Sequence, residues 1–210
     1  MPRKKRQPGP PKEPRDRIVD AALALAARQG WRDTTLADIA DEAGVTLGQL
    51  HDHFLSKGAI ITAFVRRVDT AVLAGVPAEL AKEPPRDRLF DVLMRRLDAL
   101  GAHKDAVRAI VGAQLCDPVS LACGACRLAG SMRWMLEAAR IPATGCRGRL
   151  RVKALTAGYA CVLRTWLRDD SEDLGKTMAA LDRVLRRGAA IEQTLSGLGP
   201  RRPPAQPAPA

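Results

Sequence analysis

The side chains best suited by type and spacing to contact another molecule lie between residues 35 and 54. Gln49 carries an amide that can accept from N6 and donate to N7 of adenine, the bidentate pairing by which this base is read in the DNA major groove. Two histidines, His51 and His53, follow on the same short segment. If this segment enters a major groove, Gln49 is therefore the side chain best suited to read a base.

Patterns typical of enzymes and metal sites are missing from the sequence. No G-x-S-x-G, H-E-x-x-H or G-x-G-x-x-G motif occurs, and the three histidines, His51, His53 and His103, have no carboxylate at a metal-site or triad spacing. Gly175-Lys176-Thr177 resembles the end of a P-loop, but Asp170 stands where that loop needs glycine, so we expect a helix start. We predict no enzymatic activity, no catalytic residue, no metal and no cofactor.

The five cysteines are Cys116, Cys123, Cys126, Cys146 and Cys161. An odd count without a secretory signal predicts reduced thiols in the cytoplasm. Cys123 and Cys126 form a lone C-x-x-C, and the other cysteines do not supply the second close pair that a structural zinc site needs. Small packing residues on a helix are the favoured interpretation, and a redox-sensing thiol is the alternative.

Two short amphipathic helices must position the residues between 35 and 54. The first has apolar residues at i, i+3, i+4 and i+7, and the second repeats the pattern after a break; the residues are Leu36, Ile39, Ala40 and Ala43, then Leu47, Leu50 and Phe54. Each helix has a capping box at its start, Thr35 with Asp38 and Thr46 with Gln49. Gly44 suits the left-handed turn between them. The segment therefore predicts a helix-turn-helix whose second helix enters a major groove.

Residues 16–72 resemble the N-terminal domain of the TetR family of one-component repressors. The resemblance is carried by the run Ala43-Gly-Val-Thr-x-Gly-x-Leu-x-x-His-Phe-x-x-Lys57, together with Ile18, Ala21, Ala22, Gly30, Thr35, Ile39 and Ala40. One position departs from the family pattern: His51 stands where the family usually has a tyrosine that contacts the DNA backbone.

The resemblance implies an all-α, TetR-like fold, with three DNA-binding helices followed by about six more. It also implies a homodimeric, ligand-responsive repressor that binds a double-stranded DNA operator. The residues expected to face the major groove are Thr46, Leu47, Gly48, Gln49, His51 and His53. Thr35 and Lys57 are expected to hold backbone phosphates.

The charge distribution qualifies the DNA-binding interpretation. The net charge of +11 suits a nucleic-acid partner, and residues 1–15 form a basic, proline-rich arm that we expect to be disordered. Between residues 35 and 57, however, Lys57 is outnumbered by Asp38, Asp41, Glu42 and Asp52. Attraction for phosphates must therefore come from the arm or from the arginines Arg17, Arg28, Arg32, Arg66 and Arg67.

Helical patterns with apolar faces fill most of the remaining chain. We expect Ser56 to cap a helix that ends near residue 72, a loop over 74–85, and helices over 86–100, 104–115, 117–140 and 147–168. Asp170 or Ser171 is expected to cap a final helix, and its apolar seam is Leu174, Met178, Leu181 and Leu185. We assign residues 86–197 to ligand binding and dimerisation, and the Pro/Ala-rich residues 198–210 to a disordered tail.

No apolar run is long enough to span a membrane, so a cytoplasmic protein is predicted. By resemblance to similar proteins, the helices bordering the ligand cavity carry Met94, Leu97, Met132, Trp134 and Met135. Such a lining suits a small apolar effector, and because few ionisable residues share these faces, a strongly charged effector is disfavoured.

A second resemblance supports an alternative function. Residues 88–100 and 166–182 are similar to the lipid-binding accessory protein of coenzyme Q biosynthesis, which has a TetR-like fold and binds isoprenoid lipid without acting as a repressor. The acidic helix-turn-helix and His51 fit this alternative, whereas the intact motif and the basic arm fit the DNA-binding regulator.

Overall fold

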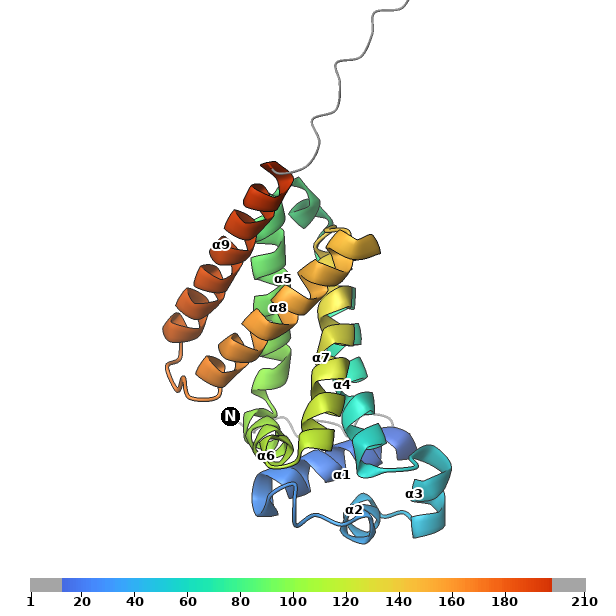
Figure 1. Cartoon of the computed structure of the whole chain (residues 1–210). Coiled ribbons are helices and arrows are strands. Elements are labelled where there is room, and N and C mark those ends of the chain that lie inside the picture. The colour runs from blue at the N-terminus through green and yellow to red at the C-terminus, as the bar shows by residue number, and fades with distance from the viewer. Residues whose placement is uncertain (1–12, 198–210) are drawn as a thin grey trace, which may run out of the picture. The chain divides into compact units, whose positions relative to one another are not determined.

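The computed structural model describes residues 13–197, with side chains described through residue 190. Within that range the chain forms nine α-helices, one short 3-10 helix and no strand, which confirms the all-α prediction (Figure 1). The chain divides into two compact units, residues 1–156 and 157–210. Most of the predicted basic arm, and the predicted Pro/Ala-rich tail, lie outside the described residues.

The predicted helix-turn-helix is present at the start of the first unit. Helix α1 spans Pro14–Gln29, α2 spans Leu36–Ala43 and α3 spans Leu47–His53. Gly44 adopts the left-handed conformation, with φ of 63° and ψ of 43°, which confirms its predicted role in the turn. Helix α1 begins at Pro14, inside residues 1–15 that were expected to form the arm, because proline is well tolerated in a first turn, where its missing N–H has no helical partner. Arg15 therefore belongs to α1 and not to the arm.

The rest of the first unit is a bundle built on α4. This helix spans Lys57–Ala74 and is followed by the 3-10 helix η1 at Ala78–Lys82, in the segment expected to be a loop. Helices α5 (Pro85–Gly101), α6 (Lys104–Leu115) and α7 (Pro118–Ala138) complete the bundle. The cap predicted at Ser56 is confirmed, since its side chain accepts a hydrogen bond from the backbone N–H three residues ahead. Asp117 caps α7 in the same way.

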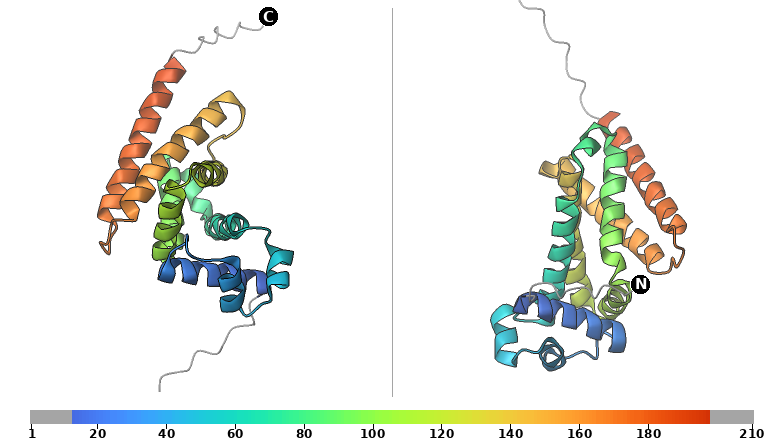
Figure 2. Two further views of the ribbon diagram at one scale, coloured as in Figure 1. Left: turned by 60° about the horizontal axis from the view of Figure 1, so that its bottom comes forward. Right: turned by 180° about the vertical axis from the view of Figure 1, so that it is seen from behind.

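The first compact unit continues across residues 72–86, where the sequence suggested a boundary between domains. The packing of the helices explains this continuity. Helix α1 packs against α6 as well as α2, and α4 packs against both α5 and α7 (Figure 2). Isoleucines from three helices, Ile18, Ile39 and Ile60, are almost completely buried. Burial of such a side chain contributes roughly 1.5–3 kcal/mol. Helices α1 and α2 thus share a continuous apolar core with the bundle behind them.

The second unit contains the C-terminal half of α8 (Gly145–Trp166) and all of α9 (Gly175–Gly197). The expectation that Asp170 or Ser171 caps α9 was wrong. Asp169 instead accepts hydrogen bonds from the backbone N–H and hydroxyl of Thr177, at 2.9 and 2.7 Å, and from the Ser171 hydroxyl. A Cβ on Gly158 would lie 2.4 Å from a methyl carbon of Val184, so α8 and α9 approach each other closely there.

Two residues of the predicted α9 seam, Leu181 and Leu185, are buried within the single chain, so they belong to its core. Of the helices that the structure describes, none combines the length and apolarity that crossing a membrane would require.

Candidate DNA-binding site

Helix α3 presents most of the predicted base-reading residues to solvent. Its apolar anchor is Leu50, which is buried, and the chain leaves the helix through the buried Phe54. The residues on the outer side are all exposed: Thr46, Leu47, Gly48, Gln49, His51 and His53. Leu47 was placed on the apolar face by its spacing, yet 54% of its surface is accessible. An exposed leucine at the helix start offers an apolar contact for a thymine methyl group.

Two capping boxes of the same design fix the starts of α2 and α3, as predicted. The Thr35 hydroxyl accepts from Asp38 N at 3.1 Å, and the Asp38 carboxylate accepts from Thr35 N at 2.8 Å. These bonds to Thr35 lower the pKa of the Asp38 carboxyl below its ordinary value. In α3 the Thr46 hydroxyl accepts from Gln49 N at 3.1 Å, and Gln49 Oε1 accepts from Thr46 N at 2.9 Å. The predicted base reader is therefore also part of its own helix cap.

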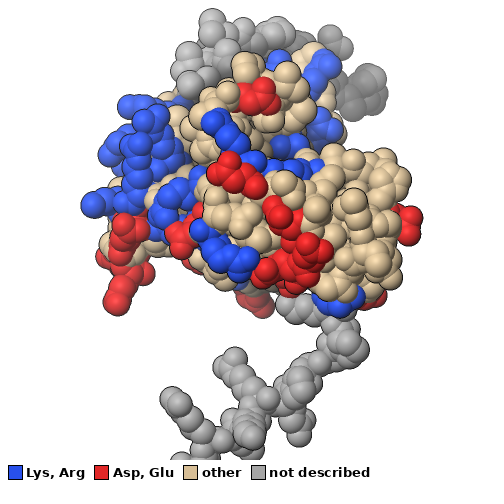
Figure 3. Space-filling view, turned by 90° about the horizontal axis from the view of Figure 1, so that it is seen from below, with Lys and Arg blue, Asp and Glu red and all other residues tan. Residues whose placement is uncertain are grey.

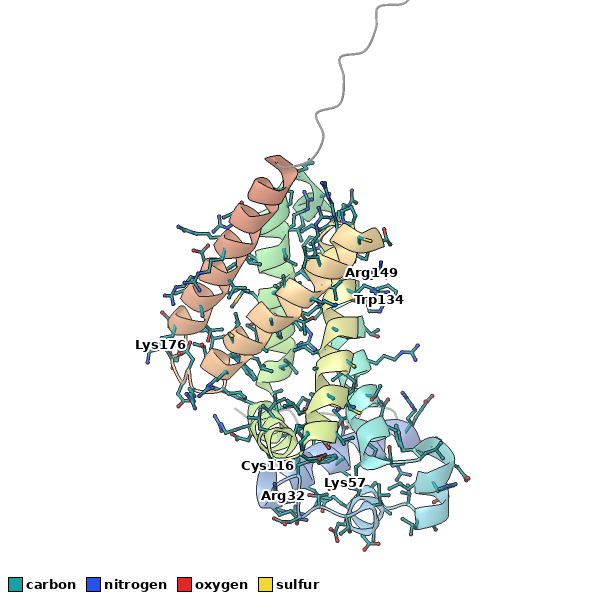
Figure 4. The ribbon with its side chains drawn as sticks, viewed as in Figure 1. Arg32, Lys57, Cys116, Trp134, Arg149 and Lys176 are labelled. Atoms are coloured by element: carbon teal, nitrogen blue, oxygen red, sulfur yellow. The ribbon has the colours of Figure 1, made fainter. Side chains whose placement is uncertain are left out.

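Lys57 has a structural role that its predicted phosphate contact did not anticipate. Its Nζ donates to the backbone carbonyl of Trp31 at 2.6 Å and to that of Thr34, and it lies 4.7 Å from the centroid of the Trp31 ring. Partial burial lowers the pKa of this ammonium group, although Asp33 and Asp38 oppose the shift. Two of its three N–H donors thus tie α4 to the turn before α2. Figure 4 shows Lys57 at the lower end of α4. One N–H donor remains for a phosphate, so the predicted phosphate contact of Lys57 stays a prediction.

Two of the predicted phosphate-binding arginines are held in ion pairs. Arg28 bonds the Glu42 carboxylate at 3.0 Å, and Arg67 bonds Asp20 at 2.7 Å. Because each arginine charge is balanced by a carboxylate of the same domain, the two arginines attract DNA phosphates less than unpaired arginines would.

The start of α1 brings other cations to the helix-turn-helix. Arg15 lies 5.5 Å from the centroid of the Phe54 ring, at the end of α3, and the Arg17 guanidinium lies beside the turn at Gly44. The charges within residues 35–57 could not predict that these arginines lie close to the motif, because their position depends on how α1 packs across it. The face seen in Figure 3 has a mostly uncharged area toward its right, with acidic groups beside it. Helix α2 itself contributes Asp38, Asp41 and Glu42. Arginines from α1 are thus the described cations best placed to offset these acids.

The predicted pocket residues do not share one lining. Leu97, Met132 and Met135 are fully buried and Met94 is partly buried, as ordinary core residues would be. Trp134 points outward from α7 with 58% of its surface accessible, so its assignment to the pocket was wrong (Figure 4). Residues 132, 134 and 135 sit on one turn of a helix, where neighbours one and two apart diverge in direction.

The expectation of few ionisable residues on these faces was also wrong. Asp69 on α4, Arg96 on α5 and Ser131 on α7 are buried and joined by hydrogen bonds, with Arg96 Nε 3.1 Å from Asp69 Oδ1 and 3.2 Å from Ser131 Oγ. The sequence did contain a signal for this buried group, since Asp69 and Arg96 are charged residues within the apolar helical segments 68–72 and 89–97.

The remaining sequence features have no assembled chemistry among the described residues. All five cysteines are free and exposed, so the favoured interpretation of Cys123 and Cys126 as packing residues was wrong. No cluster of three or more metal-ligating side chains occurs in the part of the chain that the structure describes. Gly175-Lys176-Thr177 forms the first turn of α9, as expected, and the Asp169 carboxylate already occupies the anion-binding position there.

Comparison with known proteins agrees with this geometry. A sequence model described as "Bacterial regulatory proteins, tetR family" matches residues 18–64, the segment that contains α2, α3 and every predicted DNA-binding residue. The HTH-type transcriptional repressor KstR2 of Rhodococcus jostii is 28% identical over 105 residues, which cover 46% of this chain and 52% of that protein. The uncharacterized HTH-type transcriptional regulator YerO of Bacillus subtilis is 26% identical over 98 residues, covering 45% and 34%.

These matches span about a third to a half of the length of the curated relatives. The likeness to a solved structure is more extensive. The crystal structure of a TetR transcriptional regulator from Nitrosomonas europaea superimposes with a TM-score of 0.70 at 29% identity, covering 85% of this chain and 99% of that one. The helices behind the DNA-binding segment therefore also follow the TetR fold.

Proposed function

We propose that this TetR-family protein is a homodimeric transcriptional regulator that binds an operator through α3 and changes its affinity when an effector binds. The observation that carries the proposal is the exposed outer side of α3, held on the buried Leu50 and started by an intact capping box. A single α3 reads only a few base pairs, so useful affinity requires two copies on adjacent half-sites.

Gln49 is the residue on which sequence discrimination is expected to depend. Its Oε1 accepts from Thr46 N, but an amide oxygen has a second lone pair and the amide nitrogen keeps both N–H donors. The cap therefore holds the amide in place, while its oxygen can still accept from adenine N6 and its nitrogen can still donate to adenine N7. A preorganised side chain loses less entropy when it contacts the base.

Helix α4 is the element through which an effector could act. It begins at Lys57, separated by three residues from the end of the recognition helix, and packs against α5 and α7 of the bundle. An effector with higher affinity for one position of α4 would shift the population of DNA-binding conformations by that difference in affinity. Repression is proposed as the outcome because KstR2, one of the similar proteins, is described as a repressor.

The proposal is tested by fluorescence anisotropy with DNA flanking the gene and with random DNA of equal length. Gln49→Ala should weaken operator binding by about 1–3 kcal/mol more than it weakens random-DNA binding. Asp38→Ala is the matched control, because it removes the equivalent cap bond from α2. No preference for any flanking DNA would contradict the regulator function and leave the lipid-carrier alternative.

A further inference from the structure

A cavity lies at the end of the first unit where α4 finishes, away from the helix-turn-helix. It has a volume of about 250 Å³ and is lined by residues from the end of α4, the η1 segment, the start of α5 and the end of α7. Leu73, Val76 and Leu80 supply apolar surface, and Arg88, Glu137 and Arg140 supply charge. None of the residues predicted to line an effector pocket contributes to it.

Arg88 is held in place by the protein's own backbone. Its Nε donates to the carbonyl of Ala139 at 2.7 Å, and one terminal nitrogen donates to the carbonyl of Glu83 at 2.6 Å. These bonds use two of the five N–H donors of the guanidinium. A guanidinium that is fixed in this way, with donors to spare, is preorganised to bind a carboxylate.

Arg140 lines the same cavity from an unusual backbone conformation. Its φ is +55°, a region in which a residue other than glycine is strained by the order of 1 kcal/mol. The one acidic residue of the lining, Glu137, uses Oε1 to accept from Ala143 N at 3.1 Å. Two arginines therefore face a single carboxylate that is already engaged, so the lining has a net positive charge.

We propose that this cavity binds a small amphipathic carboxylate, with the carboxylate on Arg88 and Arg140 and a short apolar body against Leu73, Val76 and Leu80. The volume lies below the roughly 300–1,000 Å³ of sites for drug-sized ligands, which favours a short chain. This differs from the sequence-based expectation of a small apolar effector, which disfavoured a strongly charged one. Leu73 belongs to α4, the helix through which an effector is proposed to act, so the bound carboxylate could serve as the effector. This role rests on the proposed regulator function.

Isothermal titration calorimetry of the full chain with hexanoate tests the site without DNA. Hexanoate should bind, and hexanamide, which has the same length and no charge, should bind at least about tenfold more weakly. Arg140→Gln should weaken hexanoate binding by at least about tenfold. Arg133→Gln is the matched control, because Arg133 is exposed on α7 and does not line the cavity. Circular dichroism melts establish that both variants are folded.

Absence of hexanoate binding at millimolar concentration, or equal affinities of the wild type and Arg140→Gln, would overturn the proposal. A separate anisotropy titration of DNA, with and without hexanoate, distinguishes this failure from failure of the regulator function. If hexanoate binds but the protein shows no operator preference, the carboxylate site is retained and the regulator function is rejected. If the protein binds an operator but not hexanoate, the regulator function is retained and the carboxylate site is rejected.

Discussion

Arg96 on α5 and Asp69 on α4 form an ion pair inside the first unit, with 3.1 Å between Nε and Oδ1 and side-chain exposures of only 4% and 12%. Ser131 on α7 bonds both partners, so the group joins three helices. A buried pair of this kind tolerates little change of geometry, since separating its members would leave each charge buried with neither its partner nor water to stabilise it. The pair therefore holds α4 against α5 and α7 in the conformation described here.

Arg96→Met should lower the free energy of unfolding by about 3–5 kcal/mol, because it leaves the Asp69 carboxylate buried without its cation. Urea denaturation measures the change. Arg95→Met is the matched control: Arg95 pairs with Asp91 on the surface of the same helix, and such pairs contribute about 0–1 kcal/mol. Similar losses in the two variants would show that the buried pair has no special role.

Lys57→Met should destabilise the protein by about 1–3 kcal/mol, because it removes the donor shared by the carbonyls of Trp31 and Thr34. The salt dependence of DNA binding should stay unchanged, since the ammonium group is directed to the protein backbone. A phosphate-binding lysine would instead reduce the slope of log K against log salt by about one. That result would support the role predicted from the sequence.

Asp169→Asn should produce a melting-temperature deficit that depends on pH. Hydrogen bonds from Ser171 and Thr177 hold the pKa of the Asp169 carboxyl well below its usual range. A lowered folded-state pKa contributes stability above the unfolded value of about 3.9, and this is lost as pH falls through the folded value. The deficit should thus be largest near neutral pH and shrink below about pH 4. A deficit independent of pH would mean that the charge is unimportant.

Deletion of residues 2–12 should weaken DNA binding and flatten its salt dependence, because five lysine and arginine charges leave with the segment. The slope should fall by up to about 0.9 for each phosphate contact that is lost. Deletion of residues 203–210, which carry no charge, is the control at the other end of the chain. An unchanged slope after the first deletion would make the arm a solubility segment.

The amino-acid sequence by itself determined the local structure of the DNA-binding segment. Both capping boxes, the left-handed Gly44 and the bounds of α2 and α3 follow from groups within a few residues of one another. Helical periodicity likewise identified the buried side of α2, because a period of 3.6 residues places i, i+3, i+4 and i+7 together.

Only the tertiary structure decided which charged groups remain available to a ligand. Lys57, Arg28 and Arg67 are engaged by partners 14 to 47 residues away in sequence. Asp69 and Arg96 find each other across two helices, and Arg88 and Arg140 meet at a cavity formed by four segments. Spacing along one helix predicts which residues share a face, but not what lies opposite, so these roles follow from the packing of the helices.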